Sequence, residues 1–223
     1  MAFEYGSVPH PIREDIVDAQ RAAWRRIAEP GAAWTGEQRV AIARCVRHER
    51  ARRSQPPWMR KEGGASEPCL PAAAVDAAAA IAVDAHRIDR AWTHDRVDAL
   101  GDVGYVELTG VVVSVIAIDA FAEALGALLE PLPDSLEGEP DGSRPDSLGN
   151  VGAHVPMTVP YAGPNVGRAL SLASGEQVMF MGLVGAMYSL RDFVTMVWKD
   201  RPLSRPQVEL VAARVSAINE CFY

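Results

Sequence analysis

The feature that most constrains the fold is a long apolar segment in the middle of the chain, residues 105–126. Its centre, residues 111–116, is rich in β-branched side chains, which favour strands by propensity. The apolar pattern nevertheless continues as far as Leu128, and this length is greater than that of an ordinary strand. The segment therefore predicts a buried helix, with a strand at residues 111–118 as the alternative.

Capping signals and amphipathic patterns predict further helices. Thr35 and Gln38 have the spacing of a capping box, and Ser204 and Gln207 repeat it with a proline in the first turn. Residues 131–164 hold seven prolines and five glycines, so we expect a surface loop there. The sequence thus predicts an all-α fold without a substantial sheet. The expected helices cover residues 12–29, 35–53, 71–86, 89–100, 105–126, 177–198 and the segment from 204 onward.

The proline- and glycine-rich segment divides the chain into an N-terminal helical half, residues 1–130, a connecting loop, residues 131–164, and a C-terminal helical half, residues 165–223. The last segment echoes earlier ones. Its opening, Ser/Thr-x-x-Gln-x-x-x-Val/Ile-Ala-x-x-Val, also follows position 34, and Val-Glu-Leu-x-x-x-x-Val-Ser-x-Ile follows both positions 105 and 207. These echoes are compatible with an internal duplication and equally with chance similarity between apolar helices.

In the second of these repeated patterns, one of the two positions that could carry chemistry differs between the segments. Glu209 aligns with Glu107, whereas Cys221 aligns with Asp119. If the halves are related, only the C-terminal one carries a thiol at this position.

Charge and hydropathy exclude several classes of protein. The net charge of −7 argues against nucleic-acid binding. The first 20 residues hold five charged side chains and lack the apolar core of a signal peptide. The most apolar run, residues 111–118, is too short to span a bilayer. We therefore expect a soluble, cytoplasmic protein with neither nucleic-acid nor membrane partners.

The cysteines and histidines suggest no disulfide framework and no metal site. Three cysteines, Cys45, Cys69 and Cys221, make an odd count, so the thiols are expected to be reduced. Cys45 falls on an apolar helix face and predicts a core position. The five histidines show no metal-binding spacing, and we expect no metal and no cofactor. Seven basic residues from Arg44 to Lys61 predict a solvated helix end, with binding of anions or nucleic acid as the alternative.

The C-terminal run carries the candidate chemistry. Glu209 stands twelve residues before Cys221, Asn219 precedes that cysteine by two positions, and Leu203 and a serine open the segment. This pattern resembles the AhpD-like alkylhydroperoxidases of the carboxymuconolactone decarboxylase superfamily, whose glutamate is followed twelve residues later by Cys-x-x-Cys and then x-x-x-His. Glu209 matches the glutamate and Cys221 the first cysteine. The positions of the second cysteine and the histidine would lie beyond Tyr223.

The resemblance implies an all-helical fold, a homo-oligomer with a dimer as the simplest case, and peroxidase activity. In the family the second cysteine attacks the hydroperoxide and becomes a sulfenic acid, with which the first cysteine condenses to a disulfide. An external dithiol reduces that disulfide, and the glutamate and histidine relay the thiol proton. The resemblance thus assigns proton relay to Glu209 and the resolving thiol to Cys221. A helix before Cys221 argues against a thioredoxin fold.

The sequence stops where the family's peroxidatic cysteine would stand, so residues 1–223 alone are expected to have little peroxidase activity. One hypothesis is that the next codon is a UGA that encodes selenocysteine, since a selenol ionises more readily than a thiol. A genuine stop after Tyr223 is the alternative.

Two other functions stay open. One is a non-catalytic interaction protein on the same scaffold, and the other is a decarboxylase-like enzyme of the superfamily that uses no cysteine pair. Taken alone, Glu209 would be a solvated carboxylate and Cys221 a small buried hydrophobe. Wide apolar faces at residues 111–129 and 178–198 favour a homo-oligomer, because a monomer would expose them.

Overall fold

The computed structural model describes residues 3–55, 59, 65–163, 165–188 and 202–218. Helices dominate the described part, and the prediction of an all-α fold is confirmed. The elements in order are α1 (Glu14–Ala28), α2 (Gly36–Ser54), α3 (Ala72–Val83), the 3-10 turn η2 (Ala85–Arg87), α4 (Arg90–Leu100), α5 (Asp102–Ala124), β1 (Leu148–Gly149), β2 (Met157–Thr158), α6 (Asn165–Arg168), α7 (Ser174–Tyr188) and α9 (Arg205–Ile218).

Helix starts follow the predicted capping signals. At α2 the backbone N–H of Gln38 donates to Thr35 Oγ1 at 3.2 Å, and the backbone N–H of Thr35 donates to Gln38 Oε1 at 3.0 Å. At α9 the backbone N–H of Ser204 donates to Gln207 Oε1 at 2.8 Å. Such contacts satisfy N–H groups that the first helical turn leaves unpaired.

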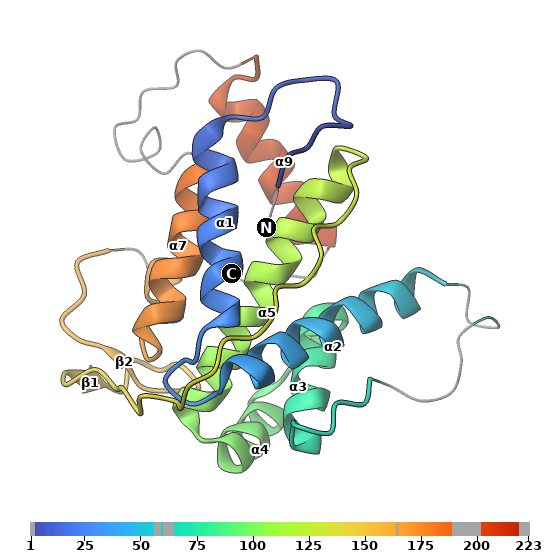
Figure 1. The fold of residues 1–223 in the computed structure, drawn as a ribbon. Coiled ribbons are helices and arrows are strands. Elements are labelled where there is room, and N and C mark those ends of the chain that lie inside the picture. Colours follow the sequence, from blue (N-terminus) through green and yellow to red (C-terminus); the bar gives the residue numbers. More distant parts are fainter. Residues whose placement is uncertain (1–2, 56–58, 60–64, 164, 189–201, 219–223) are drawn as a thin grey trace.

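The long apolar segment is the central helix α5, which settles the choice between helix and strand. It packs against α2, α3, α4 and α7 (Figure 1). Val111, Val112 and Val115 are completely buried. By length and composition alone α5 could cross a membrane, but 61% of its most apolar window is buried inside the fold, as in the core helix of a soluble protein.

The helix α1 and the later helix α7 pack together and against α5. Two tryptophans fix loops to this core: Trp24 Nε1 donates to the carbonyl of Pro131 at 2.8 Å, and Trp34 Nε1 donates to the carbonyl of Gly104 at 2.8 Å. Because α7 follows the loop 131–164, the C-terminal half contributes directly to the core of the N-terminal half.

The described part of the predicted loop, residues 131–163, is irregular apart from one small antiparallel pair, in which Leu148 faces Thr158 and Gly149 faces Met157. The predicted helix at residues 177–198 is present as α7 up to Tyr188, and its remainder lies outside the described residues. The apolar face of α5 is covered within the chain itself, so that face gives no reason to expect an oligomer.

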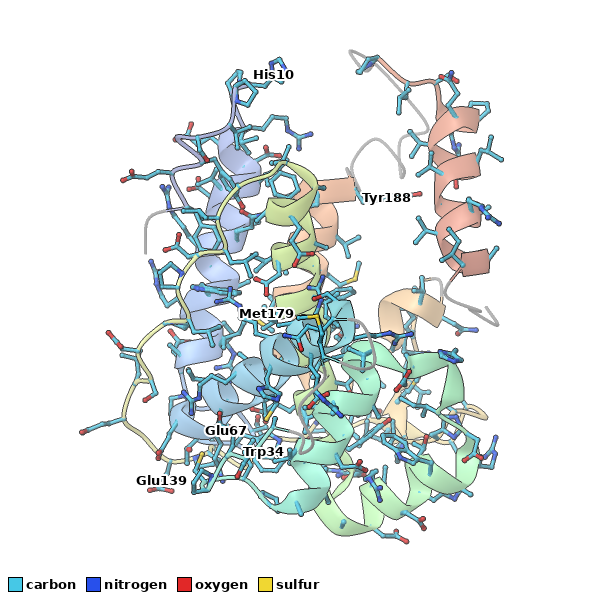
Figure 2. The ribbon with its side chains drawn as sticks, turned by 90° about the vertical axis from the view of Figure 1, so that its right-hand side faces the viewer. His10, Trp34, Glu67, Glu139, Met179 and Tyr188 are labelled. Carbon is cyan, nitrogen blue, oxygen red and sulfur yellow. The ribbon has the colours of Figure 1, made fainter. Side chains whose placement is uncertain are left out.

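The last helix, α9, differs from the other long helices in its exposure to solvent. None of its residues is buried, and in Figure 2 it stands apart from α1 and α7. Its exposed apolar side chains are Leu210, Val211, Val215 and Ile218. A helix of 14 residues gains little stability from propensity alone.

Candidate functional site

The motif glutamate lies on α9 and is partly accessible to solvent. The side chain of Glu209 is 42% exposed, and its Oε1 lies 3.4 Å from Nε of Arg205, one turn earlier. Cys221 lies outside the described residues, so the predicted proximity of Glu209 to this cysteine stays a prediction.

The two other cysteines are poor candidates for a nucleophile. Both are thiols, and Cys45 is completely buried, which confirms its predicted core position. Burial raises the pKa of the Cys45 thiol to about 12, and Glu67 adds to this effect. The pKa of Cys69 is also raised, first by burial and then by Glu37. Because the thiolate is the reactive form, neither environment favours attack on a hydroperoxide at neutral pH.

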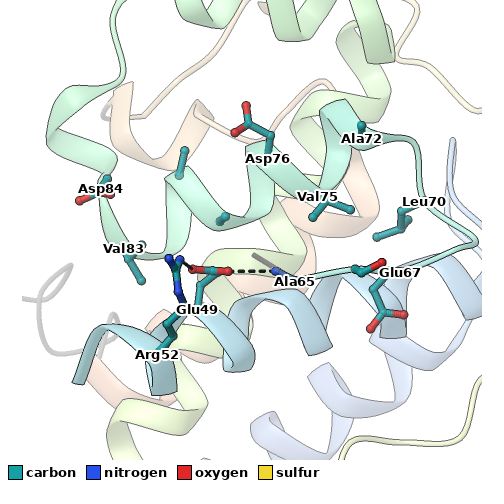
Figure 3. Close-up of a pocket in the computed structure, with 13 residues that line it drawn as sticks. Glu49, Arg52, Ala65, Glu67, Leu70, Ala72, Val75, Asp76, Val83 and Asp84 are labelled. Carbon is teal, nitrogen blue, oxygen red and sulfur yellow. Dashed lines mark hydrogen bonds and ion pairs between the residues drawn. The ribbon is translucent and has the colours of Figure 1, made fainter. Parts of the chain in front are cut away.

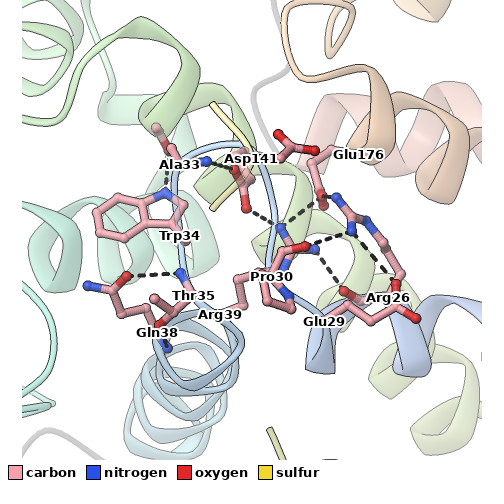
Figure 4. A network of polar contacts seen from close by, with 12 residues as sticks. Arg26, Glu29, Pro30, Ala33, Trp34, Thr35, Gln38, Arg39, Asp141 and Glu176 are labelled. Atoms are coloured by element: carbon pink, nitrogen blue, oxygen red, sulfur yellow. Dashed lines mark hydrogen bonds and ion pairs between the residues drawn. The ribbon is translucent and has the colours of Figure 1, made fainter. Parts of the chain in front are cut away.

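A buried charged network joins the helices α1, α2, α5 and α7 (Figure 4). Arg39 of α2 is completely buried, and its Nη1 donates to Glu107 Oε1 of α5. The same Nη1 lies 2.9 Å from Glu176 Oε1 of α7. Arg26 of α1 completes the network with a guanidinium 3.6 Å from Glu176. One buried arginine therefore serves two buried carboxylates, with a second arginine at the edge.

Backbone groups orient the members of this network. Glu107 Oε2 accepts from the backbone N–H of Ala33 at 2.7 Å, and Arg39 Nη2 donates to the carbonyl of Arg26 at 3.1 Å. Two glycines make room: a Cβ on Gly31 would lie 1.7 Å from Glu107 Oε1, and one on Gly110 would lie 2.6 Å from the Cβ of Glu176. The absence of a side chain at Gly31 and Gly110 therefore leaves the space that Glu107 and Glu176 occupy.

The two carboxylates are not equivalent. Glu107 accepts hydrogen bonds at both oxygens, whereas neither oxygen of Glu176 has a hydrogen-bond partner in the described part of the chain. Burial raises the pKa of Glu176 above its usual value, and the attraction of Arg39 only partly offsets this. Burial alone would lower the pKa of Arg39, but Glu176 and Glu107 raise it overall. Burial therefore favours the neutral, protonated form of the Glu176 carboxyl more than solvent would.

A second buried pair occupies the position that aligns with the motif cysteine. Asp119 is 2% exposed and accepts from Nε and Nη2 of Arg47 at 2.9 and 2.8 Å. The guanidinium of Arg47 also lies 5.3 Å from the ring centre of Trp24. On α5 both aligned positions, Glu107 and Asp119, therefore hold structural ion pairs with α2.

The basic stretch lies at the C-terminal end of α2, whose last turn holds Arg52 and Arg53, and Arg44 and Arg53 are 46% and 51% exposed, in line with the predicted solvated helix end. Its described arginines pair with acids from other segments or from the same helix, and Arg47 is only 20% exposed. The pairs are Arg44–Glu67, Arg47–Asp119, Arg50–Glu123, Arg52–Glu49 and Arg53–Asp84. Sequence reasoning did not single out Arg39, Glu107 or Glu176 as a cluster. The available signal was limited to charges inside apolar helices: Glu176 is the single charged residue of α7, and Glu107 lies in the apolar first half of α5.

Two cavities lie along the C-terminal part of α2. One, of about 590 Å³, lies between α2, α3 and the segment before α3 (Figure 3). In it Glu49 accepts from the backbone N–H of Ala65 and from Arg52, both at 3.1 Å. The other, of about 680 Å³, is lined by residues of α2, α3 and α5 and by Ile218 of α9. Only the second reaches the motif helix.

In the described ranges no three histidine, cysteine or acidic side chains cluster as metal ligands would. No protein-family model, no curated protein and no solved structure matches the chain. The residues and their geometry therefore carry the functional argument alone.

Proposed function

We propose that the protein is an AhpD-like, thiol- or selenol-dependent hydroperoxide reductase whose redox centre is built on α9. The observation that carries the proposal is the position of Glu209 on the helix α9, which starts at the Ser204 cap, together with the presence of Cys221 twelve residues later in the sequence. In this centre Glu209 accepts a proton and Cys221 is the resolving thiol.

The reaction balances with two chalcogen groups and a dithiol. In a form of the chain extended by a cysteine or selenocysteine at position 224, as the resemblance implies, the thiolate or selenolate would attack the terminal oxygen of the hydroperoxide, which breaks the O–O bond, releases an alcohol after proton uptake and leaves a sulfenic or selenenic acid. The Cys221 thiol then displaces water to form a disulfide or selenenyl sulfide. An external dithiol returns two electrons and two protons by exchange and is itself oxidised to a disulfide.

Three features support this proposal. The scaffold is helical, as the family resemblance implies. Cys45 and Cys69 both have raised thiol pKa values, which leaves Cys221 as the candidate redox cysteine among the three. Glu209 is accessible enough to exchange a proton with solvent.

The test uses a completed form, defined as residues 1–223 followed by a cysteine at position 224, three alanines and a histidine at position 228. This form is expected to consume a hydroperoxide in the presence of a dithiol, and Cys221→Ser in the same form is expected to lose turnover. Cys69→Ser is the matched control and retains it. A folded completed form that reduces no hydroperoxide contradicts the proposal.

The proposed protein works in the cytoplasm as a homo-oligomer, most simply a dimer. The exposed side chains Leu210, Val211, Val215 and Ile218 support this assembly, because a contact between copies would cover them. Light scattering checks the mass, and a value of 24.0 kDa at micromolar concentration would contradict the dimer.

The same exposed helix favours one alternative, a non-catalytic interaction protein. On that account α9 is a docking helix and Cys221 has no redox role. A completed form that is folded, inactive towards hydroperoxides and larger than a monomer would favour this alternative.

A further inference from the structure

A third cavity, of about 430 Å³, lies at the C-terminal end of α5. Small-molecule sites usually measure roughly 300–1,000 Å³, so this cavity is large enough to hold a small ligand. Its walls come from three places that are distant in sequence: the N-terminal segment, residues 3–7, the last two turns of α5, and residues 127–131.

The floor of this cavity is apolar. Phe3, Ile118 and Ala122 line it and are almost completely buried. Leu128 and Leu129 also line it but are exposed, so they mark the side on which the cavity opens to solvent. An alkyl chain that enters from the open side would remove its own apolar surface and that of the floor from water.

The N-terminal segment forms its wall in a conformation that costs free energy. Phe3 and Tyr5 have φ angles of 38° and 45°, in the left-handed region that residues other than glycine rarely adopt. Aromatic contacts fix both residues, because the ring of Phe3 packs edge-on against Trp24 at 5.6 Å and that of Tyr5 against Phe121 at 5.7 Å, measured between ring centres. Backbone of this kind persists only where its surroundings determine it, and it is frequent at ligand-binding sites.

The charges around the cavity favour a cation. Glu4 and Glu130 line it, and none of the described lining residues is a lysine, arginine or histidine. Glu4 is exposed and forms no ion pair within the described part of the chain. The third acid of the lining, Asp119, is balanced by Arg47. The C-terminal end of a helix is also the negative end of its dipole, so a positive group is favoured here and a carboxylate is disfavoured.

We infer that this cavity is a binding site for small amphipathic cations, such as primary alkylammonium ions, with the alkyl chain on the apolar floor and the ammonium group beside Glu4. A neutral molecule with the same chain keeps the apolar contact but lacks the attraction to Glu4. The site contains no residue of α9, and its ligand is independent of the proposed redox function.

The experiment is isothermal titration calorimetry of the 223-residue chain at pH 7 with octylammonium, octanol and octanoate, which share one chain length and differ in charge. Octylammonium is expected to bind most tightly, octanol about threefold more weakly because it lacks the charge, and octanoate most weakly. Octanol or octanoate that binds as tightly as octylammonium, or octylammonium that does not bind, would overturn the inference.

A pair of variants locates the site on α5. Ala122→Leu fills the floor of the cavity and is expected to weaken octylammonium about tenfold or more. Ala124→Leu is the matched control, because Ala124 is exposed on the same helix and does not line the cavity. Thermal unfolding shows whether both variants fold. Ala127→Leu fills the cavity from the opposite wall and replaces Ala122→Leu if that variant does not fold. An unchanged Kd in a folded cavity-filling variant would overturn the inference.

A second pair of variants tests the charge. Glu4→Gln is expected to weaken octylammonium about threefold and to leave the Kd of octanol unchanged. Glu139→Gln is the matched control, because Glu139 is an exposed glutamate that does not line the cavity. An unchanged Kd for octylammonium in Glu4→Gln, or an equal loss in Glu139→Gln, would overturn the inference. None of these measurements reads turnover, so their outcome leaves the test of the peroxidase proposal unaffected.

Discussion

The helices α5 and α9 share the pattern Val-Glu-Leu-x-x-x-x-Val-Ser-x-Ile, yet their surroundings are opposite. In α5 Glu107 is completely buried and bonded to Arg39, whereas in α9 Glu209 is 42% exposed and pairs with Arg205 on its own helix. Leu108 is completely buried, and its counterpart Leu210 is 71% exposed. The same sequence pattern therefore forms a buried core helix at α5 and a solvent-accessible helix at α9.

The difference shows why a glutamate on an apolar helix cannot be interpreted from its own segment. The neighbours of Glu107 come from α2, α7 and the turn before α2, all distant in sequence. Burial and partners decide whether such a carboxylate stabilises the fold or stays available for proton transfer.

The largest expected effect is on the buried arginine. Arg39→Met would leave Glu107 and Glu176 as two buried carboxylates without their shared cation, and we expect a loss of about 5 kcal/mol in the free energy of unfolding. Arg205→Met, at the exposed pair of α9, should cost less than about 1 kcal/mol. Chemical denaturation measures both, and similar losses would remove the contrast between the helices.

The next contrast concerns the aligned leucines. Leu108→Ala opens space in the core and should cost about 3 kcal/mol, whereas Leu210→Ala should change stability by less than about 0.5 kcal/mol. If Leu210→Ala lowers the free energy of unfolding more than Leu108→Ala does in a dilute sample, Leu210 is packed in solution. The contrast between a buried α5 and an exposed α9 is then wrong.

A smaller effect concerns pH. The pKa of Glu176 is raised in the folded state by burial, so the folded chain keeps a proton that the unfolded chain loses as pH rises above the ordinary pKa of a glutamate, 4.5. The stability from this group is present below that value and falls as pH rises through the folded-state pKa. The free energy of unfolding of Glu176→Gln minus that of the parent should therefore increase with pH over this window. A difference that is flat or decreases with pH would contradict the raised pKa.

The smallest effect is expected at an accessible pair between Asp102, at the start of α5, and Arg144 of the following loop. The hydrogen bond from Arg144 lowers the pKa of Asp102, so its contribution is present at neutral pH and is lost as pH falls through the folded-state pKa. Both side chains are partly exposed, and Asp102→Asn should cost less than about 1 kcal/mol at pH 7. Unfolding curves of Asp102→Asn and the parent that coincide at low pH but differ at pH 7 would confirm that the pKa of Asp102 is lowered in the folded state.

Much of the fold follows from local signals in the sequence. The capping residues Thr35 and Ser204 mark helix starts, and the length of the apolar run fixed α5 as a helix. The burial of Cys45 also followed from its helix face. These features depend on residues close together in the chain, which is why periodicity and capping predict them.

The buried network could not be predicted in the same way. Arg39 and Glu107 are 68 residues apart, and Glu176 reaches them only because α7 packs on α1 and α5. The room left by Gly31 and Gly110 is likewise visible only once the helices are assembled. The sequence marked the motif pair Glu209 and Cys221, but their proximity depends on residues outside the described part.

The most direct test removes the carboxylate of the exposed glutamate, Glu209, in the completed form. Hydroperoxide turnover is measured for Glu209→Gln at a temperature where the protein is folded. The account predicts a loss of about 10²-fold or more with an unchanged unfolding transition, because Glu209 accepts the proton but does not hold the core. Turnover of Glu209→Gln equal to that of the parent would contradict the account, since the exposed glutamate would then have no part in the chemistry.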